Sequence, residues 1–181
     1  MSVLDAVRDR QSFSKVSEVA PTHEQLLPLV EAAASVADHG SMRPWRLIEL
    51  RGDARVRLGE AFAKAAGVEG KHAEKLGEKP LRASLLIAVV GVYTPSFKVP
   101  EWEQEAVASG VAHSLSLLLD DAGWGVFWRT GIYTRSKPVA KMHGLAPNEK
   151  LLGWLYVGGK PDKRKPEKKK RFDASRVITS L

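Results

Sequence analysis

The sequence predicts an α/β or α+β sandwich, and three observations lead to that fold class. First, 181 residues fit one compact domain. Second, segments of helical period alternate with short apolar segments that have the length of strands. Third, only about four segments have strand character, which makes a small sheet. We predict one domain over residues 1–159, followed by a basic extension over residues 160–181.

The first third of the chain predicts a helix, a second helix, a strand and a third helix. Residues 3–10 place their apolar side chains on one helical face. The second helix begins at Thr22, because Gln25 three positions later completes a capping-box pattern. Residues 45–50 read as a strand that ends at Arg-Gly-Asp, and residues 53–66 return to helical period.

The middle of the chain predicts one loop, one buried strand and the longest helix. Residues 67–83 are rich in Gly, Lys and Glu, so we expect a mobile excursion there. The continuous aliphatic run over residues 84–93 predicts a strand covered on both faces. Residues 100–122 carry apolar side chains three or four positions apart, with small residues between them. Since small residues permit close approach, this helix is expected at the centre of the packing.

The remaining elements are short. Residues 124–129 predict a strand, residues 138–143 a helix and residues 151–157 a second buried strand. Because about four strands make a small sheet, the pattern also suggests help from a second copy of the chain.

The net charge of +7 is concentrated in one segment. Residues 160–171, KPDKRKPEKKKR, contain eight basic and two acidic side chains, whereas a nucleic-acid-binding fold spreads its basic residues over a face. The chain has no cysteine, which excludes disulfides and thiolate metal sites and fits a cytoplasmic location. Its apolar runs are too short to span a bilayer, and its N-terminal residues lack a signal-peptide pattern.

Several familiar signatures are missing from the sequence. There is no Walker A motif, no HExxH and no GxGxxG, so we expect no metal site and no Rossmann fingerprint. Asp38, His39 and Ser41 offer hydrolase chemistry, but neighbours in one tight turn seldom meet the geometry of a triad. We expect His113 in the core of the long helix and His143 at the surface.

Three polar residues, Arg10, Gln11 and Ser12, follow the first predicted helix directly. A flavin mononucleotide needs cationic donors for its phosphate and further donors near the ring edge that becomes negative on reduction. An arginine and a serine two positions apart supply both kinds of donor. The alternative is structural, since a basic last turn offsets a helix dipole.

Three further segments combine aromatic and polar residues. The turn over residues 38–45 leads through Pro-Trp into a strand, although an aromatic residue entering a strand is usually core. Residues 98–104 place Trp102 among charged neighbours, which suits either the mouth of a substrate site or a plain surface position. Residues 124–131 end an aromatic strand in Arg-Thr-Gly, which delivers a cation, a hydroxyl and an open backbone N–H to one place. The alternative for this last segment is an ordinary turn after a strand.

Taken in order, these segments resemble the nitroreductase family, and most closely its short YdjA-like branch. The resemblance covers about residues 3–160 and includes R-x-S at 10–12, APTxEQL at 20–26, DHxSMxPW at 38–45, KVPxWEQE at 98–105, WR[ST]G at 128–131 and GxLYxG at 153–158. It implies an α+β fold, namely an α/β/α sandwich with a mixed, mainly antiparallel sheet. It also implies an obligate homodimer with two FMN sites at the interface.

The resemblance assigns the cofactor-binding residues. It implies that one chain contributes Arg10, Gln11 and Ser12, and that Arg129, Thr130 and Gly131 touch the ring and the ribityl region. The partner chain would contribute His39 and, more weakly, Ser41. Lys169 and Arg171 in the basic extension are similar to a phosphate-binding K-x-R of longer family members, and that extension either wraps the partner subunit or stays loose. Ser35 and Arg43 depart from the branch, which has Arg and Gln at these positions.

The implied activity is that of an FMN-dependent oxidoreductase. NADH or NADPH would deliver hydride to flavin N5, and a small acceptor such as a nitroaromatic or a quinone would then take it in a ping-pong exchange. No protein nucleophile is needed, so the resemblance implies no catalytic side chain. Two alternatives stay open, a flavin-binding protein without appreciable turnover and a basic-tailed nucleic-acid-binding protein.

Overall fold

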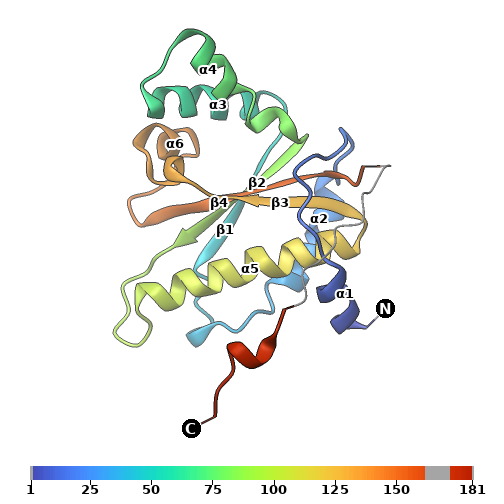
Figure 1. The fold of residues 1–181 in the computed structure, drawn as a ribbon. Helices are drawn as coiled ribbons and strands as arrows, with labels where there is room; N and C mark the ends of the chain where they lie inside the picture. The colour runs from blue at the N-terminus through green and yellow to red at the C-terminus, as the bar shows by residue number, and fades with distance from the viewer. Residues whose placement is uncertain (1, 162–171, 181) are drawn as a thin grey trace.

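The computed structural model describes residues 2–161 and 172–180 of the chain (Figure 1). The α-helices are α1 (Val3–Asp9), α2 (His23–Ala33), α3 (Asp53–Ala66), α4 (Gly70–Gly77), α5 (Glu101–Asp121) and α6 (Lys137–Met142). The strands are β1 (Trp45–Leu50), β2 (Leu85–Val92), β3 (Trp124–Arg129) and β4 (Glu149–Gly159). Short 3-10 turns are η1 (His39–Ser41), η2 (Pro80–Arg82), η3 (Ile132–Arg135) and η4 (Ala174–Arg176).

The four strands form one sheet in the order β1-β2-β4-β3. All three pairings are antiparallel, and the β2–β4 pairing shifts register between Val89 and Val90. The predicted mainly antiparallel sheet is therefore confirmed, whereas no parallel pair occurs among the described residues.

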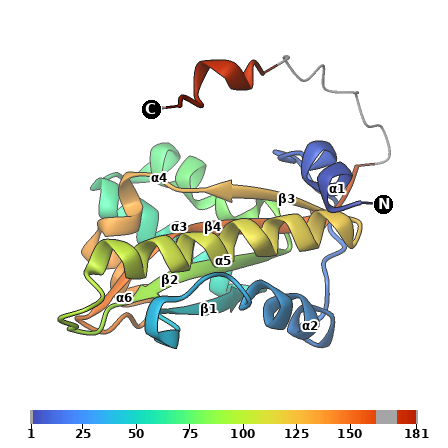
Figure 2. The same ribbon diagram turned by 90° about the horizontal axis from the view of Figure 1, so that it is seen from below.

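Helices cover both faces of this sheet, as Figures 1 and 2 show. Along β2, Leu85, Ile87 and Val89 point into a core shared with α2 and α5. The alternate residues Leu86 and Ala88, with their neighbours, point into a second core shared with α3 and α6. The strand is buried almost throughout, which confirms the prediction of a strand covered on both faces.

Residues 67–83 fold into α4 and η2, so the expectation of a loop in this segment is wrong. Two of its glycines have structural roles, Gly77 in the contact between α3 and α4 and Gly67 at the end of α3. A Cβ placed on Gly59 of α3 would lie 2.6 Å from the Cα of Gly77 in α4, so the two helices touch backbone to backbone. Gly67 ends α3 in the left-handed conformation at a φ of 63°.

The segment after α1 docks on β3 and on the end of β4. The Phe13 backbone N–H donates to the Val126 carbonyl at 2.9 Å, and the Ser17 N–H donates to the Gly159 carbonyl at 2.9 Å. A Cβ on Gly158 would lie 2.5 Å from the Ser17 carbonyl oxygen, so this contact requires glycine. The bond to Val126 covers part of the open edge of β3. The bond to Gly159 fixes the same segment at the end of β4.

No helix in the described ranges combines the length and apolarity needed to cross a membrane.

Candidate functional site

A cavity of about 560 Å³ opens where β3 ends. Five separate parts of the chain contribute to its wall, namely α3, the end of the α4–η2 segment, β3, η3 and β4. The lining residues are Phe62, Lys79, Arg82, Phe127, Trp128, Arg129, Thr130, Gly131, Ile132, Tyr133, Trp154 and Tyr156. A second cavity of about 550 Å³ shares Arg82 and Arg129 with the first and adds Ser14, Lys15 and Val16. We call the two together the paired cavities.

Arg129 lies against the aromatic wall of the paired cavities. Its guanidinium carbon is 4.4 Å from the ring centroid of Phe127 and 5.0 Å from that of Tyr156. Phe127 and Tyr156 are cross-strand partners in β3 and β4, which explains why the two rings share this arginine. The buried Nε of Arg129 has no hydrogen-bond partner among the described residues. A ligand with an acceptor group would satisfy it.

Tyr156 adds a phenol to the same wall. Burial raises the pKa of Tyr156 to about 12, although the positive charges of Arg129 and Arg82 act in the opposite direction. The hydroxyl is therefore protonated at neutral pH and is able to donate a hydrogen bond to a ligand.

The charges on the walls of the paired cavities are all positive. Lys15, Lys79, Arg82 and Arg129 are lining residues, and the linings contain no aspartate or glutamate. None of these four cations forms an ion pair with a described residue. An aromatic wall surrounded by unpaired cations suits a planar ligand that carries negative charge.

The predicted polar residues after α1 lie directly before the part of the chain that lines the second cavity. Arg10 Nη1 is 3.4 Å from Ser12 Oγ, to which it donates, and Ser14 to Val16 follow along the cavity wall. Phe13 docks on Val126 of β3, so the R-x-S segment comes directly before the point at which the chain joins the strand that ends at Arg129.

His39 and Ser41 lie in the turn before β1, away from the lining of the paired cavities. His39 Nδ1 is 2.9 Å from Glu103 Oε2 of α5. The Asp38 carboxylate accepts hydrogen bonds from the backbone N–H groups of Met42 at 3.2 Å and Arg43 at 2.7 Å. These bonds hold Ser41 and Arg43 at φ values of 52° and 48°, a strained conformation for residues other than glycine.

Trp102 lies on the first turn of α5 and is 70% exposed. It is near the His39–Glu103 pair in the chain and also stands apart from the paired cavities. One chain therefore presents two separate groups of predicted residues, one at the end of β3 and one at the start of α5. Lys169 and Arg171 lie outside the described residues, and Ser35 uses its hydroxyl locally, donating to the Ala32 carbonyl at 2.8 Å.

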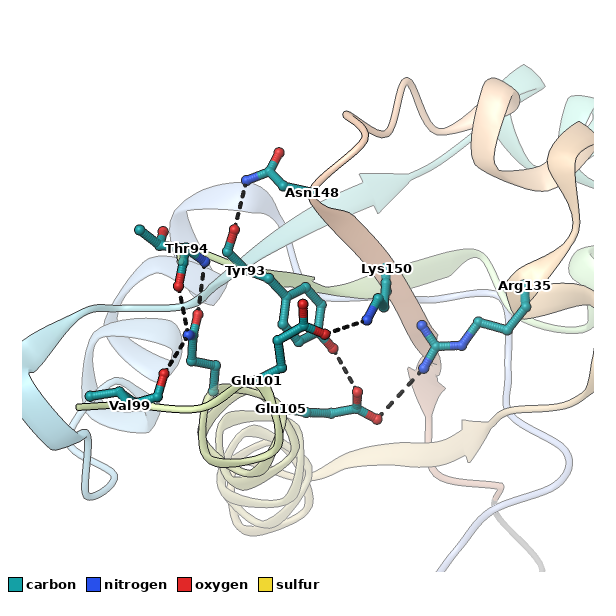
Figure 3. Close-up of polar contacts among 9 residues, drawn as sticks. Tyr93, Thr94, Val99, Glu101, Glu105, Arg135, Asn148 and Lys150 are labelled. Carbon is teal, nitrogen blue, oxygen red and sulfur yellow. Dashed lines mark hydrogen bonds and ion pairs between the residues drawn. The ribbon is translucent and has the colours of Figure 1, made fainter. Parts of the chain in front are cut away.

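A polar cluster joins the end of β2 to the start of α5 (Figure 3). The buried Gln104 amide donates to the carbonyls of Thr94 and Val99 at 2.8 and 3.0 Å and accepts from the Thr94 N–H at 2.9 Å. Tyr93 donates its hydroxyl to Glu105 at 2.7 Å, and Glu105 in turn lies 3.6 Å from Arg135. Because these groups satisfy one another, the cluster fixes the start of α5 and is structural.

Two histidine assignments from the sequence are wrong. His113 is exposed on α5, with its ring edge-to-face to Trp128 at 4.9 Å, whereas a core position was expected. His143 is buried, whereas a surface position was expected. The error at His143 arises because its partner, Trp154 on β4, is 11 residues away in the chain and no local pattern reveals it.

Sequence reasoning also missed Lys79, Arg82 and Tyr156 as wall residues. Tyr156 lies within the GxLYxG segment, and its pairing with Phe127 becomes visible only once the strand register is known. Lys79 and Arg82 lie in the segment that was expected to be a mobile loop.

Comparison with known proteins agrees with this architecture. The sequence model of the Nitroreductase family matches residues 7–159. The chain belongs to the nitroreductase family. It is 36% identical over 161 residues to the Escherichia coli (strain K12) protein named Putative NAD(P)H nitroreductase YdjA, a match that covers 87% of this chain and 88% of the relative.

Solved structures share the fold. The nitroreductase-like family protein from Bacillus cereus superimposes with a TM-score of 0.86 at 20% identity, over 100% of this chain and 96% of that one. The FMN and NADPH-dependent nitroreductase NfnB from sphigopyxis sp. strain HMH gives a TM-score of 0.74 at 16% identity, over 100% and 99% of the two chains.

Proposed function

We propose that this nitroreductase-family protein is an FMN-dependent oxidoreductase that transfers hydride from NADH or NADPH to a small acceptor, such as a nitroaromatic or a quinone, in a ping-pong exchange. The observation that carries the proposal is the set of paired cavities, in which aromatic side chains and unpaired cations line the same space. The related NAD(P)H nitroreductase and the FMN-dependent neighbour NfnB support the same activity.

The wall residues fit an FMN group. Its phosphate and ring edge require cations and hydrogen-bond donors, and the wall offers Arg129 with an unpartnered Nε and Tyr156 with a protonated hydroxyl. Gly131 has a φ of 135° and no side chain, which leaves its backbone open to a close ligand. Bound FMN would supply the redox centre at which the nicotinamide and the acceptor react in turn.

The protein's own contribution would be position and charge. Arg10 and Ser12 would bind the phosphate side of the nucleotide, and Arg129 and Thr130 would bind the side nearer the end of β3. The absence of carboxylates from the lining would keep the field of these cations unopposed. No general base is required for hydride transfer, so no wall residue needs an acid–base role.

We further propose that a second copy completes the site. His39, Ser41 and Trp102 lie apart from the paired cavities in one chain, so a two-fold partner would be needed to bring them there. The apolar face of α1 supports such an interface, because Val3, Leu4 and Val7 are 78%, 56% and 54% exposed and α1 buries no residue. Exposed Phe172, Val177 and Ile178 in the C-terminal segment offer further apolar surface, and that segment stands away from the sheet (Figure 2).

The test of the proposed function is spectroscopic. The purified protein is expected to bind FMN, show the visible absorption of oxidised flavin, and lose that absorption when NADH or NADPH is added without oxygen. An Arg129→Ala variant should bind FMN more weakly by about tenfold or more, because a charge-assisted hydrogen bond is lost. A preparation that takes up no flavin from excess FMN would remove the proposal. Unchanged affinity and reduction rate in Arg129→Ala would remove only the role of that arginine.

A further inference from the structure

Arg82 is the second arginine shared by the paired cavities. It ends η2, the turn that leads from α4 into β2, so it reaches the cavities from a different element than Arg129 on β3. Its side chain is exposed and forms no ion pair with a described residue. The charge of Arg82 acts on Tyr156, whose ring Arg129 covers. Both arginines are therefore electrostatically coupled to the same part of the wall.

Two unpaired cations beside one small space repel each other, and an anion placed between them lowers the electrostatic energy of the group. The linings provide no carboxylate that could take this place. Arg129 is held against Phe127 and Tyr156 at 4.4 and 5.0 Å, which restricts its movement away from the cavity. The described residues thus supply no counter-charge for the two arginines, which leaves room for a negatively charged ligand, and the aromatic wall favours a ligand with a planar ring.

We propose that Arg82 and Arg129 together bind one negatively charged group of the flavin nucleotide, which makes Arg82 a cofactor-binding residue. This inference rests on the proposed function. The charged group is either the phosphate or the pyrimidine edge of the ring, which becomes negative on reduction. Both sources present an anion to a pair of guanidinium groups, and the experiment below separates them.

The experiment compares full-length wild type with Arg82→Gln and Arg82→Lys. Arg57→Gln serves as the matched control, because Arg57 is an exposed arginine on α3 outside the cavity linings. Each protein is freed of flavin and titrated with FMN and with riboflavin, which lacks the phosphate, and binding is followed by flavin fluorescence. The midpoint potential of each FMN complex is then measured. Circular dichroism and thermal unfolding check that the variants are folded.

Arg82→Gln is expected to raise the Kd for FMN about tenfold, Arg82→Lys to restore part of the affinity, and Arg57→Gln to bind as wild type does. A loss seen with FMN but not with riboflavin identifies the phosphate. A loss seen with both, together with a lower midpoint potential, identifies the ring edge. If reduced flavin loses tenfold more affinity than oxidised flavin, the potential falls by about 30 mV.

Two results would overturn the inference while the proposed function stands. One is wild-type affinity and potential in Arg82→Gln, and the other is an equal loss in the Arg57→Gln control. Failure of the wild-type protein to bind FMN would instead contradict the proposed function itself.

Discussion

His143 has both ring nitrogens engaged inside the protein. Nδ1 lies 2.8 Å from the Val139 carbonyl oxygen, and the Trp154 indole N–H donates to Nε2 at 3.0 Å. Only the neutral ring with its proton on Nδ1 satisfies both contacts, because a proton on Nε2 would face the indole N–H. Burial lowers the pKa of His143, because the charged ring would lose its hydration inside the protein.

We predict that neutral His143 stabilises the folded protein, and that this stabilisation is lost in acid. Because the folded pKa is lower than the unfolded value of about 6.5, the stabilisation is fully present above that value and is lost as pH falls toward the folded pKa. His143→Phe should be less stable at neutral pH by about 1–3 kcal/mol, since the Trp154 N–H loses its acceptor. Its stability should vary less with pH over the acid range.

Urea unfolding at a series of pH values measures this difference. His72→Gln is the control, because His72 is exposed on α4 and should leave the slope unchanged. Parallel pH profiles for wild type and His143→Phe would contradict the prediction.

At the residue scale, the sequence allowed prediction of those positions whose chemistry is local. The Thr22–Gln25 capping box is confirmed by both of its hydrogen bonds, because all its atoms lie within one turn of chain. Arg129 was a candidate site residue because a strand ending in Arg-Thr-Gly is visible in the sequence, and it lines both cavities. Tyr156 was not a candidate, because its place beside Arg129 depends on the pairing of β3 with β4. Arg82 was not a candidate either, because it reaches the same wall only through the fold of the segment after α4. Long-range neighbours are fixed by packing rather than by local pattern.

The contact between α3 and α4 involves two glycines, of which only Gly59 lacks space for a side chain. A Cβ on Gly59 would lie 2.6 Å from the Gly77 Cα, whereas a Cβ on Gly77 would meet no atom within 4 Å. We predict that Gly59→Ala destabilises the protein by about 1–3 kcal/mol through overpacking. Gly77→Ala should be neutral or stabilise it by up to about 1 kcal/mol, because alanine favours helix.

Thermal or urea unfolding of the two alanine variants tests this contact directly. Each variant adds the same methyl group to a helix, so each is the control for the other. Equal stability changes in the two variants would show that α3 and α4 do not pack backbone to backbone.

At the element scale, prediction succeeded for strands and failed for α4. β1, α3 and β3 have the predicted limits, since each combines a clear period with a Gly, Pro or Asp at its boundary. α4 lacks an apolar stripe long enough to be recognised, and it is stabilised by its contact with α3. The contact with α3 stabilises a helix in a segment whose Gly, Lys and Glu content predicts a loop.

For the whole molecule, the exposed apolar face of α1 predicts a dimer that a single charge would disrupt. Val7→Glu should increase the monomer fraction, because it places a carboxylate on a face that buries nothing within its own chain. Val56→Glu is the control, since Val56 is 46% exposed on α3, on the opposite side of the sheet (Figure 1).

Sedimentation velocity over a range of concentrations measures the outcome. The wild type and Val56→Glu are expected to sediment as dimers, and Val7→Glu as a mixture shifted toward monomer. A monomeric wild type, or a Val7→Glu variant as dimeric as the wild type, would contradict the proposed interface.

The position of β4 in the sheet has a consequence for how the molecule is made. β4 is the last strand in the chain, yet it lies between β2 and β3 and pairs with both. During synthesis, the aliphatic β2 and the aromatic β3 therefore stay unpaired on the sides that contact β4 until residues 149–159 have left the ribosome. Such late, long-range pairing slows folding and leaves apolar strand edges open to other chains. Nascent chains of this protein are thus expected to need protection from aggregation until synthesis is nearly finished.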